Sequence, residues 1–169
     1  FQGQSGIAPQ VLAATTNGLV IDLANLDFYF PSEVISDTYA VWDAAPGNPL
    51  AANYVAASIK SALYNRAQAY PNVQYLVLVG GDRIIPHRRI RDEALVANER
   101  SYAALAATSE LSGSMRLRYF LSDDYYAGLL PLRYKARELY VPHVALGRLV
   151  ETPTEIVQTI ADYTGGRTV

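Results

Sequence analysis

The sequence predicts an α/β fold, with a three-layer α-β-α arrangement around a mainly parallel sheet. Residues 73–79 form a near-continuous apolar run, which is typical of a strand buried on both faces of a parallel sheet. Residues 49–70, directly before this run, carry an apolar stripe at helical spacing. Residues 141–150 form a second apolar run, followed at once by a helix start signal. Alternating helices and buried strands are typical of parallel sheets.

Composition limits the classes of function. The chain has 169 residues, of which 50% are hydrophobic and 18% charged, so it favours a globular domain over a disordered chain. A net charge of -2 gives no reason to expect nucleic acid or a membrane surface as partner. The chain has no cysteine, which excludes a disulfide framework, a thiolate metal site and a cysteine nucleophile within it.

The domain organisation is predicted to be simple. Phe1, Gln2 and Gly3 resemble the remnant of a cleavable tag, which suggests a fragment of a longer protein. Residues 4–17 are small and polar, and we interpret residues 1–17 together as tag remnant and linker. Residues 18–169 are predicted to form a single α/β subdomain.

The first half of this subdomain is predicted to contain two strands and two helices. A strand core is expected at 19–21, and a helix over 32–42 is expected to begin at Ser32 after the aromatic segment 28–30. Asn48 and Pro49 form a strong helix start, with an N-cap followed by proline at the first helical position. That helix runs to about residue 70, and the apolar strand follows.

The second half is predicted to alternate loops with regular elements. Residues 81–91 are expected to be a loop, 92–107 a helix capped by Asp92, 108–114 a surface loop and 116–121 a short strand. Residues 129–140 are interpreted as a hairpin or an excursion, and 141–150 as the next buried strand. Thr152 and Glu155 form a capping box for a last helix that ends at Gly165 and buries, among others, Tyr163.

Gly80, Gly81 and Asp82 follow the central apolar strand. Ligands of open α/β sheets bind beyond the carboxyl ends of strands, so Asp82 points to the functional edge. The glycines lack the spacing and the lysine of a phosphate-binding loop. The favoured interpretation is a tight turn in which Asp82 caps loop amides, with a metal or inter-domain role as the alternative.

Asp123 and Asp124 supply two further carboxylates after a predicted strand. Together with Asp82 they are the candidate metal ligands, and calcium is the metal that loop carboxylates and carbonyls favour. No EF-hand spacing is present, so an Asx turn that fixes the loop is the alternative.

The remaining reactive side chains give weaker signals. His87 follows a strand end among arginines and is the better functional candidate of the two histidines, whereas His143 is expected to be structural. Ser122 lacks the glycine-flanked elbow of a serine nucleophile, and two histidines without cysteine make zinc improbable.

Four arginines, at positions 83, 88, 89 and 91, form the densest charge run. A solvated loop is the default interpretation, and binding of an anion or a partner is the alternative. Arg148, just after Gly147, is expected to pair with a carboxylate such as Asp82 or Asp123.

Three stretches, taken in order, resemble the gingipain-type cysteine peptidases, a caspase-like family. They are residues 75–82 (YLVLVGGD) with Ile85 and Pro86, residues 122–127 (SDDYYA) and residues 144–149 (VALGRL). Their order and spacing are similar to those of the family's amino-terminal catalytic subdomain, over about residues 55–163. The doubled glycine departs from the usual family pattern of one glycine. The residues assigned to structural or interface roles are Gly80, Gly81, Ser122, Tyr125, Tyr126, Gly147, Arg148 and His87.

The resemblance implies a parallel sheet with helices on both sides in a secreted or cell-surface bacterial protein. It also implies peptide-bond cleavage by a His–Cys dyad on a following subdomain. No residue of this chain matches that dyad, so no catalytic and no cofactor-binding residue is assigned. Calcium near the strand ends is likewise an expectation of the family.

Three functional hypotheses follow. The first is a non-catalytic subdomain that supports the carboxy-terminal catalytic subdomain of the same polypeptide, acts on peptide or protein substrates only through it, and is inactive alone. The second is a stand-alone α/β binding or interaction module that uses the arginine-rich loop. The third, a nucleotide-binding enzyme, predicts thermal stabilisation by nucleotides.

Overall fold

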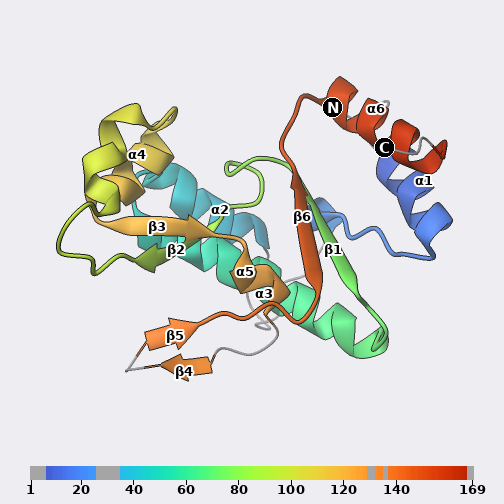
Figure 1. The fold of residues 1–169 in the computed structure, drawn as a ribbon, viewed down its shortest axis with the longest axis horizontal. Coiled ribbons are helices and arrows are strands. Elements are labelled where there is room, and N and C mark those ends of the chain that lie inside the picture. Colours follow the sequence, from blue (N-terminus) through green and yellow to red (C-terminus); the bar gives the residue numbers. More distant parts are fainter. Residues whose placement is uncertain (1–6, 26–34, 129–131, 135–136, 167–169) are drawn as a thin grey trace.

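The computed structural model describes residues 7–25, 35–128, 132–134 and 137–166. Within these ranges the chain is a mixed α/β protein with a small parallel sheet, two antiparallel strand pairs and helices (Figure 1). The helices are α1 (Ile7–Thr16), η1 (Leu23–Asn25), α2 (Ile35–Ala44), α3 (Pro49–Ala69), η2 (Glu99–Leu105), α4 (Ser109–Arg116), α5 (Asp124–Ala127) and α6 (Pro153–Thr164). The strands are β1 (Tyr75–Val79), β2 (Arg88–Arg91), β3 (Tyr119–Ser122), β4 (Leu132–Tyr134), β5 (Arg137–Leu139) and β6 (Ala145–Leu149).

The parallel sheet consists of β1 and β6, in the register that places Val77 opposite Gly147. Successive side chains of a strand point to opposite faces, so Leu76 and Leu78 share one face, and Tyr75, Val77 and Val79 share the other. Leu78 is 3% exposed, whereas Tyr75 is 73% and Val77 44% exposed. The prediction that this strand is buried on both faces is therefore wrong for the described chain.

Helix α3 covers the buried face of the sheet. It begins as predicted, because the Asn48 side chain accepts a hydrogen bond from the Leu50 amide (3.0 Å) and Pro49 occupies the first turn. Val55 and Ile59, from its apolar stripe, are at most 1% exposed and pack in one core with Leu78. Burying such aliphatic side chains contributes about 1.5–3 kcal/mol each.

Helices α1 and α6 pack on the other face, at its carboxyl end only. A second core joins Ala8 of α1 and Ile160 of α6 to Val79 and Leu149 of the sheet. Figure 1 shows the two helices side by side, close to the carboxyl ends of β1 and β6. The capping box of α6 is confirmed, but Tyr163 is 67% exposed, so its predicted burial is wrong.

The remaining strands form two antiparallel pairs. Strand β2 pairs with β3, next to η2 and α4. Strands β4 and β5 form the hairpin that was one of the two interpretations of residues 129–140. Strand β2 includes three of the four clustered arginines, so the predicted loop over 81–91 ends at residue 87.

Two segments that were predicted to be linker or loop contain helices. The predicted linker contains α1, which packs on α6. The predicted surface loop over 108–114 contains most of α4, whose N-cap Thr108 accepts a hydrogen bond from the Leu111 amide (3.3 Å). No described strand lies at 19–21, where the chain leads into η1.

The helix predicted over 92–107 is a turn followed by the 3₁₀ helix η2. Asp92 accepts hydrogen bonds from the amides of Ala94 (2.8 Å) and Glu99 (3.0 Å), so it caps a loop in place of a helix. Asn98 then caps η2 by accepting from the Arg100 amide.

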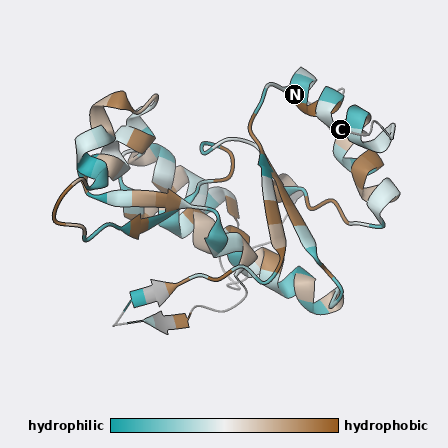
Figure 2. Cartoon of the chain, in the orientation of Figure 1, coloured by the Kyte–Doolittle hydropathy of each residue, from teal (hydrophilic) through white to brown (hydrophobic). Residues whose placement is uncertain are grey.

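Hydropathy differs between the parallel strands and the helices. Figure 2 shows hydrophobic residues concentrated along β1 and β6, with hydrophilic residues interspersed along the helices. No helix in the described ranges combines the length and apolar character needed to cross a membrane. The predicted aromatic segment 28–30 and the helix start at Ser32 lie outside the described residues.

Candidate functional site at the carboxyl end of the sheet

The candidate site centres on the loop of residues 80–87, which leaves β1. Gly80 has φ +134°, which strains any residue with a side chain, and a Cβ there would lie 3.0 Å from Ile84. The amides of Ile84 and Ile85 both donate to the Gly81 carbonyl. The predicted tight turn after the strand is therefore present, and Gly80 is the glycine that it requires.

Asp82 organises this loop, as its favoured interpretation predicted. Its Oδ1 atom accepts a hydrogen bond from the His87 amide (2.9 Å), which closes the loop. Arg89 donates from Nη1 to Oδ1 (2.7 Å) and from Nη2 to Oδ2 (2.6 Å). The Arg89 side chain has no exposed area and that of Asp82 is 11% exposed, so this bidentate ion pair lies inside the protein.

The surroundings of Asp82 favour its charged form. Burial by itself would raise the pKa of Asp82, but hydrogen bonds from His87 and Arg89, with the charge of Arg89, lower it to about 2. Asp82 is thus an ionised structural carboxylate at neutral pH and is unsuited to act as a general base there.

A second ion pair lies beside the first. Arg148 of β6 donates from Nε to Oδ2 of Asp123 (2.7 Å) and from Nη2 to Oδ1 (2.5 Å). Its Nη1 atom donates to the carbonyls of Gly80 and Ile85, both at 2.8 Å. The predicted pairing of Arg148 with a carboxylate is confirmed, and Asp123 is the partner.

His87 lies between the two ion pairs. Its Nδ1 atom is 2.9 Å from Asp82 Oδ1, and its Nε2 atom is 3.6 Å from Asp123 Oδ2. The ring is partly exposed, at 24% of its side-chain area. The five side chains form one row, in the order Arg89, Asp82, His87, Asp123 and Arg148, and we call this row the charged row.

Two tyrosines hold the same loop from other elements. Tyr126 of α5 donates its hydroxyl to the Pro86 carbonyl (2.5 Å), and Tyr39 of α2 donates to the Ile84 carbonyl. Burial raises the pKa of Tyr39 to about 12 and raises that of Tyr126 well above its ordinary value. Both hydroxyls therefore remain protonated donors across the physiological pH range.

Side chains thus hold five carbonyls of residues 80–87: Arg148 at Gly80 and Ile85, Tyr39 at Ile84, Tyr126 at Pro86 and Arg89 at His87. Loops usually leave such groups to water. Here the donors come from α2, α5, β2 and β6, so the loop joins four elements.

The other predicted site residues make local or packing contacts that are typical of structural roles. Ser122 accepts from the Asp124 amide (3.1 Å), which is the ordinary geometry of a local turn. Tyr125 and Tyr126 are buried and meet edge to face. Gly147 lies in the middle of β6, with no atom within 4 Å of a Cβ built there.

The candidate metal ligands are not brought together into a metal site. Asp82 and Asp123 each face a bidentate guanidinium, and Asp124 is exposed on the first turn of α5. No group of three histidine or acidic side chains in the described ranges has the arrangement needed for a metal ion. Two guanidiniums beside the carboxylates oppose a calcium ion by charge repulsion, so the charge distribution does not favour calcium.

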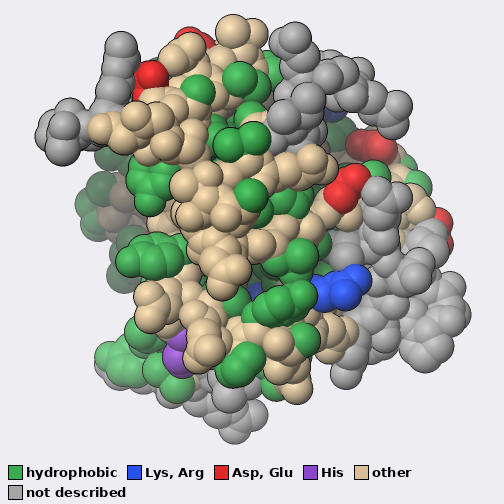
Figure 3. All heavy atoms as spheres, turned by 90° about the vertical axis from the view of Figure 1, so that its right-hand side faces the viewer, with side chains coloured by type: hydrophobic (Ala, Val, Ile, Leu, Met, Phe, Trp, Pro, Cys, Tyr) green, Lys and Arg blue, Asp and Glu red, His purple; other side chains and the backbone are tan. Residues whose placement is uncertain are grey.

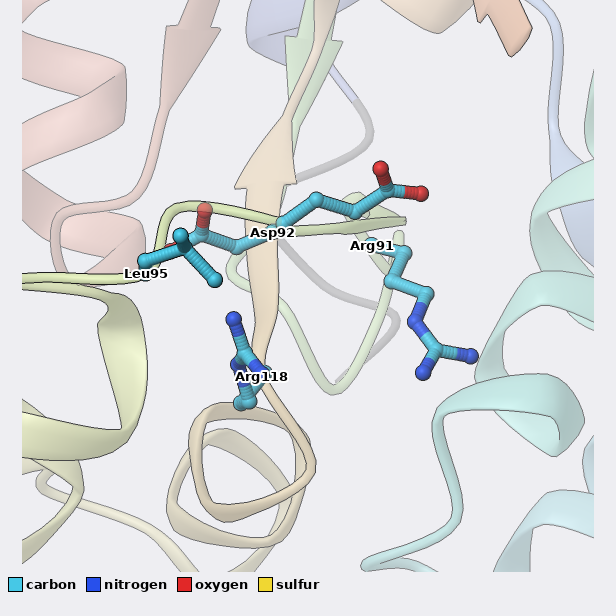
Figure 4. A pocket seen from close by; sticks show the side chains of 5 residues that line it. Arg91, Asp92, Leu95 and Arg118 are labelled. Carbon is cyan, nitrogen blue, oxygen red and sulfur yellow. The ribbon is translucent and has the colours of Figure 1, made fainter. Parts of the chain in front are cut away.

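The clustered arginines are mostly engaged within the protein. Arg83 Nε lies 3.2 Å from Glu110, the Arg88 guanidinium lies over the ring of Tyr125, and Arg89 belongs to the charged row. An open pocket of about 230 Å³ is lined by Arg91, Asp92, Glu93, Leu95 and Arg118. Figure 4 shows that the Arg91 side chain points away from Arg118, so the two guanidiniums do not converge on one anion.

Sequence reasoning missed the residues that hold Arg89. Asn53 of α3 pairs with the backbone of Arg89 at both its amide (2.7 Å) and its carbonyl (2.8 Å). Ser114 accepts from Arg89 Nε (3.3 Å), and the guanidinium lies 5.5 Å from the ring of Trp42. These partners come from three separate helices, and no local sequence pattern relates them to Arg89.

The described arrangement is suited to stabilise the fold of the loop of residues 80–87. Cysteine is absent, and the Ser114 hydroxyl donates to the Glu110 carbonyl while it accepts from Arg89. Comparison of the chain with family models, curated proteins and solved structures finds no match. The function is therefore inferred from the residues and the geometry of this chain.

Proposed function

We propose that this chain is the non-catalytic amino-terminal subdomain of a gingipain-like cysteine endopeptidase that is secreted or held at the cell surface. Its role is to present the sheet edge and face on which a following His–Cys catalytic subdomain is built. The finer architecture proposed is one half of a caspase-like, three-layer α-β-α fold. The 169-residue chain is then inactive by itself.

The observation that carries this proposal is the mismatch between the composition of β1 and its burial. Its sequence, YLVLV, is that of a strand covered on both faces, yet Tyr75 is 73% and Val77 44% exposed. Contiguous exposed apolar patches of more than about a few hundred Å² commonly mark surfaces that contact another layer or partner. A further layer over this face accounts for both the composition and the exposure.

The charged row gives secondary support. Gly80, Asp123 and Arg148 belong to the three separate stretches that resemble the family, and Arg148 bonds to the other two. The stretches therefore form one structural unit, as three motifs of one subdomain should. The layers are also compatible, because α3 lies on one face of the sheet and α1 with α6 on the other.

The structure gives less support to the alternative of a stand-alone module that binds anions through the arginine-rich loop. Arg89 is buried and ion-paired, and Arg83 is paired with Glu110. These side chains are engaged within the chain and do not converge on an open site.

A peptidase assay tests the proposal. The polypeptide encoded by the parent gene, extended beyond Val169, is expected to contain a His and a Cys and to cleave peptides in a thiol-dependent way. The 169-residue chain is the matched control and is expected to show no cleavage. Thiol-dependent cleavage by the 169-residue chain, or a parent gene without downstream His and Cys codons, contradicts the proposal.

A further inference from the structure

Strands β2 and β3 form a two-stranded ribbon that is separate from the parallel sheet (Figure 1). Each strand of such a ribbon has an inner edge, which is bonded to its neighbour, and an outer edge whose amides and carbonyls need other partners. A ribbon of two strands is marginally stable by itself, so a third strand along an outer edge stabilises it. The two outer edges of this ribbon differ in how they are completed.

The outer edge of β2 is closed by a side chain. The Asn53 side chain of α3 bonds to both the amide (2.7 Å) and the carbonyl (2.8 Å) of Arg89, as a neighbouring strand would. Three of the four β2 residues are arginines, and charged side chains on an edge oppose the addition of another strand. Strand β2 is therefore protected against pairing on its outer side.

The outer edge of β3 has unpaired backbone groups in the described chain. Leu121 lies opposite Arg89, and because the amide and carbonyl of Arg89 bond away from β3, those of Leu121 point away from β2. The same alternation places the amide and carbonyl of Tyr119 outward, and the bond from the Asp92 amide to the Arg118 carbonyl (2.7 Å) agrees with it. Within the described ranges, no hydrogen bond involves the amide or carbonyl of Tyr119 or Leu121.

The side chains of β3 do not protect this edge. Its sequence, YFLS, contains no charged residue, proline or glycine, and its aromatic residues favour strands. None of its four residues is buried, and Phe120 is 37% exposed. An edge of this composition with unpaired backbone groups is a template for another strand.

We infer that β3 pairs antiparallel with β3 of a second copy of this chain, with the two Phe120 residues opposite each other. Tyr119 and Leu121 lie symmetrically about Phe120, so this register bonds all the outward amides and carbonyls of both residues. The Phe120 side chains then form a non-hydrogen-bonded pair with Cβ atoms about 4.5–5.5 Å apart, where aromatic rings interact favourably. Arg118 lies opposite Ser122 of the second copy, so no like charges meet.

A second copy is the partner that this edge matches, because β3 is complementary to itself. A two-fold axis through Phe120 brings together two edges with the same spacing of donors and acceptors, which is the symmetry of most homodimers. The strand is short, so the interface is small and the association is expected to be weak and dependent on concentration. The pairing involves no residue of β1 and does not depend on the proposed function.

Sedimentation velocity over a concentration series of the 169-residue chain tests the pairing. The wild-type chain is expected to sediment increasingly as a dimer as its concentration rises. Phe120→Lys and Phe120→Glu each place two like charges opposite each other, and each is expected to weaken the dimer by about tenfold or more. An equimolar mixture of the two variants places opposite charges together and is expected to restore association.

Two further variants separate β3 from other surfaces. Leu121→Pro removes an outward amide that no described bond uses, so it is expected to abolish the dimer while the chain stays folded. Figure 3 shows the side of the molecule that contains β1, β6, α1 and α6, with hydrophobic side chains in several groups and few charged ones. Tyr75→Lys, on the exposed face of β1, is the matched control for that side and is expected to leave the dimer unchanged.

A wild-type chain that stays monomeric up to about 1 mM overturns the inference. A dimer that survives Phe120→Lys, or that Tyr75→Lys abolishes, also overturns it, because each result assigns the contact to another surface. If Leu121→Pro loses its folded circular-dichroism spectrum, the mixture of the two Phe120 variants decides. Only facing Phe120 residues allow the mixture to associate more strongly than either variant alone, so a mixture that does not do so contradicts the pairing.

Discussion

The carboxyl end of the parallel sheet and its open face differ in how they are completed. At the carboxyl end, side chains of the charged row and two tyrosines form hydrogen bonds with the loop of residues 80–87. These side chains come from four elements of the chain. On the open face, Tyr75 and Val77 remain exposed beside Gly147, and no described atom lies within 4 Å of a Cβ built on that glycine. The comparison indicates that the carboxyl end maintains the fold, whereas the open face is the surface that we propose for contact with a further layer.

The largest expected effect comes from breaking the buried end of the charged row. Arg89→Met is expected to destabilise the chain by about 3–5 kcal/mol, because it leaves the Asp82 carboxylate buried without its bidentate partner. Urea unfolding measures the change. Arg91→Met, on an exposed arginine of the same strand, is the control and is expected to stay within about 0.5 kcal/mol. Equal effects of the two variants contradict the structural role of the row.

Two adjacent residues of β1 compare the two faces directly. Leu78→Ala is expected to cost about 3 kcal/mol, because Leu78 is 3% exposed in the core with α3. Val77→Ala on the open face is expected to cost less than about 1 kcal/mol in the same chain. Thermal and urea unfolding of both variants measure the difference. A large cost for Val77→Ala means that this face is already covered.

The stability of the charged row is expected to depend on pH. The folded-state pKa of Asp82 is lowered from 3.8 to about 2, so its stabilising contribution is complete above about pH 4 and is lost as the pH falls through about 2. The contribution amounts to roughly 2 kcal/mol. Asp82→Asn is expected to flatten the fall of unfolding free energy between pH 4 and 2, and equal slopes for both proteins contradict this assignment.

Two glycines allow a tightly packed position to be compared with an open one. A Cβ on Gly113 of α4 would lie 2.6 Å from the backbone of Gly47, so Gly113→Ala is expected to cost about 1–2 kcal/mol despite the better helix propensity of alanine. Gly147→Ala is the matched control and is expected to be neutral or slightly stabilising, because nothing lies near its Cβ position. Differential scanning calorimetry measures both. A stabilised Gly113→Ala shows that the two backbones are not in contact.

Calcium is expected to have the smallest effect. Because Asp82 and Asp123 are paired with guanidiniums, addition of calcium or of a chelator is expected to leave the melting temperature unchanged within about 1 °C. Calorimetric titration is expected to show no binding heat. A measurable heat that Asp124→Asn abolishes restores the metal-site hypothesis.

The sequence predicted those elements whose signals are local. The Asn48–Pro49 start of α3 and the Thr152–Glu155 capping box of α6 are present because caps act over three or four residues. The roles of Asp82 in its loop and of Arg148 beside Asp123 were also anticipated, since strand ends gather polar side chains at one edge.

What the sequence did not predict depends on contacts between distant segments. The partners of Arg89, which include Asn53 and Ser114, come from helices far apart in the chain. The sequence predicts Thr108 in a loop, whereas it caps α4, because a threonine in a polar segment favours a turn and a helix cap alike. The open face of β1 was missed for a different reason, since its composition is that of a strand with both faces covered.

The most direct test of the central claim is the peptidase activity of the extended polypeptide carrying Val77→Glu. A charge on the open face is expected to lower thiol-dependent cleavage by at least tenfold, while the 169-residue chain with the same substitution keeps its folded circular-dichroism spectrum. Full activity of the Val77→Glu polypeptide would contradict the claim that this face supports the catalytic subdomain.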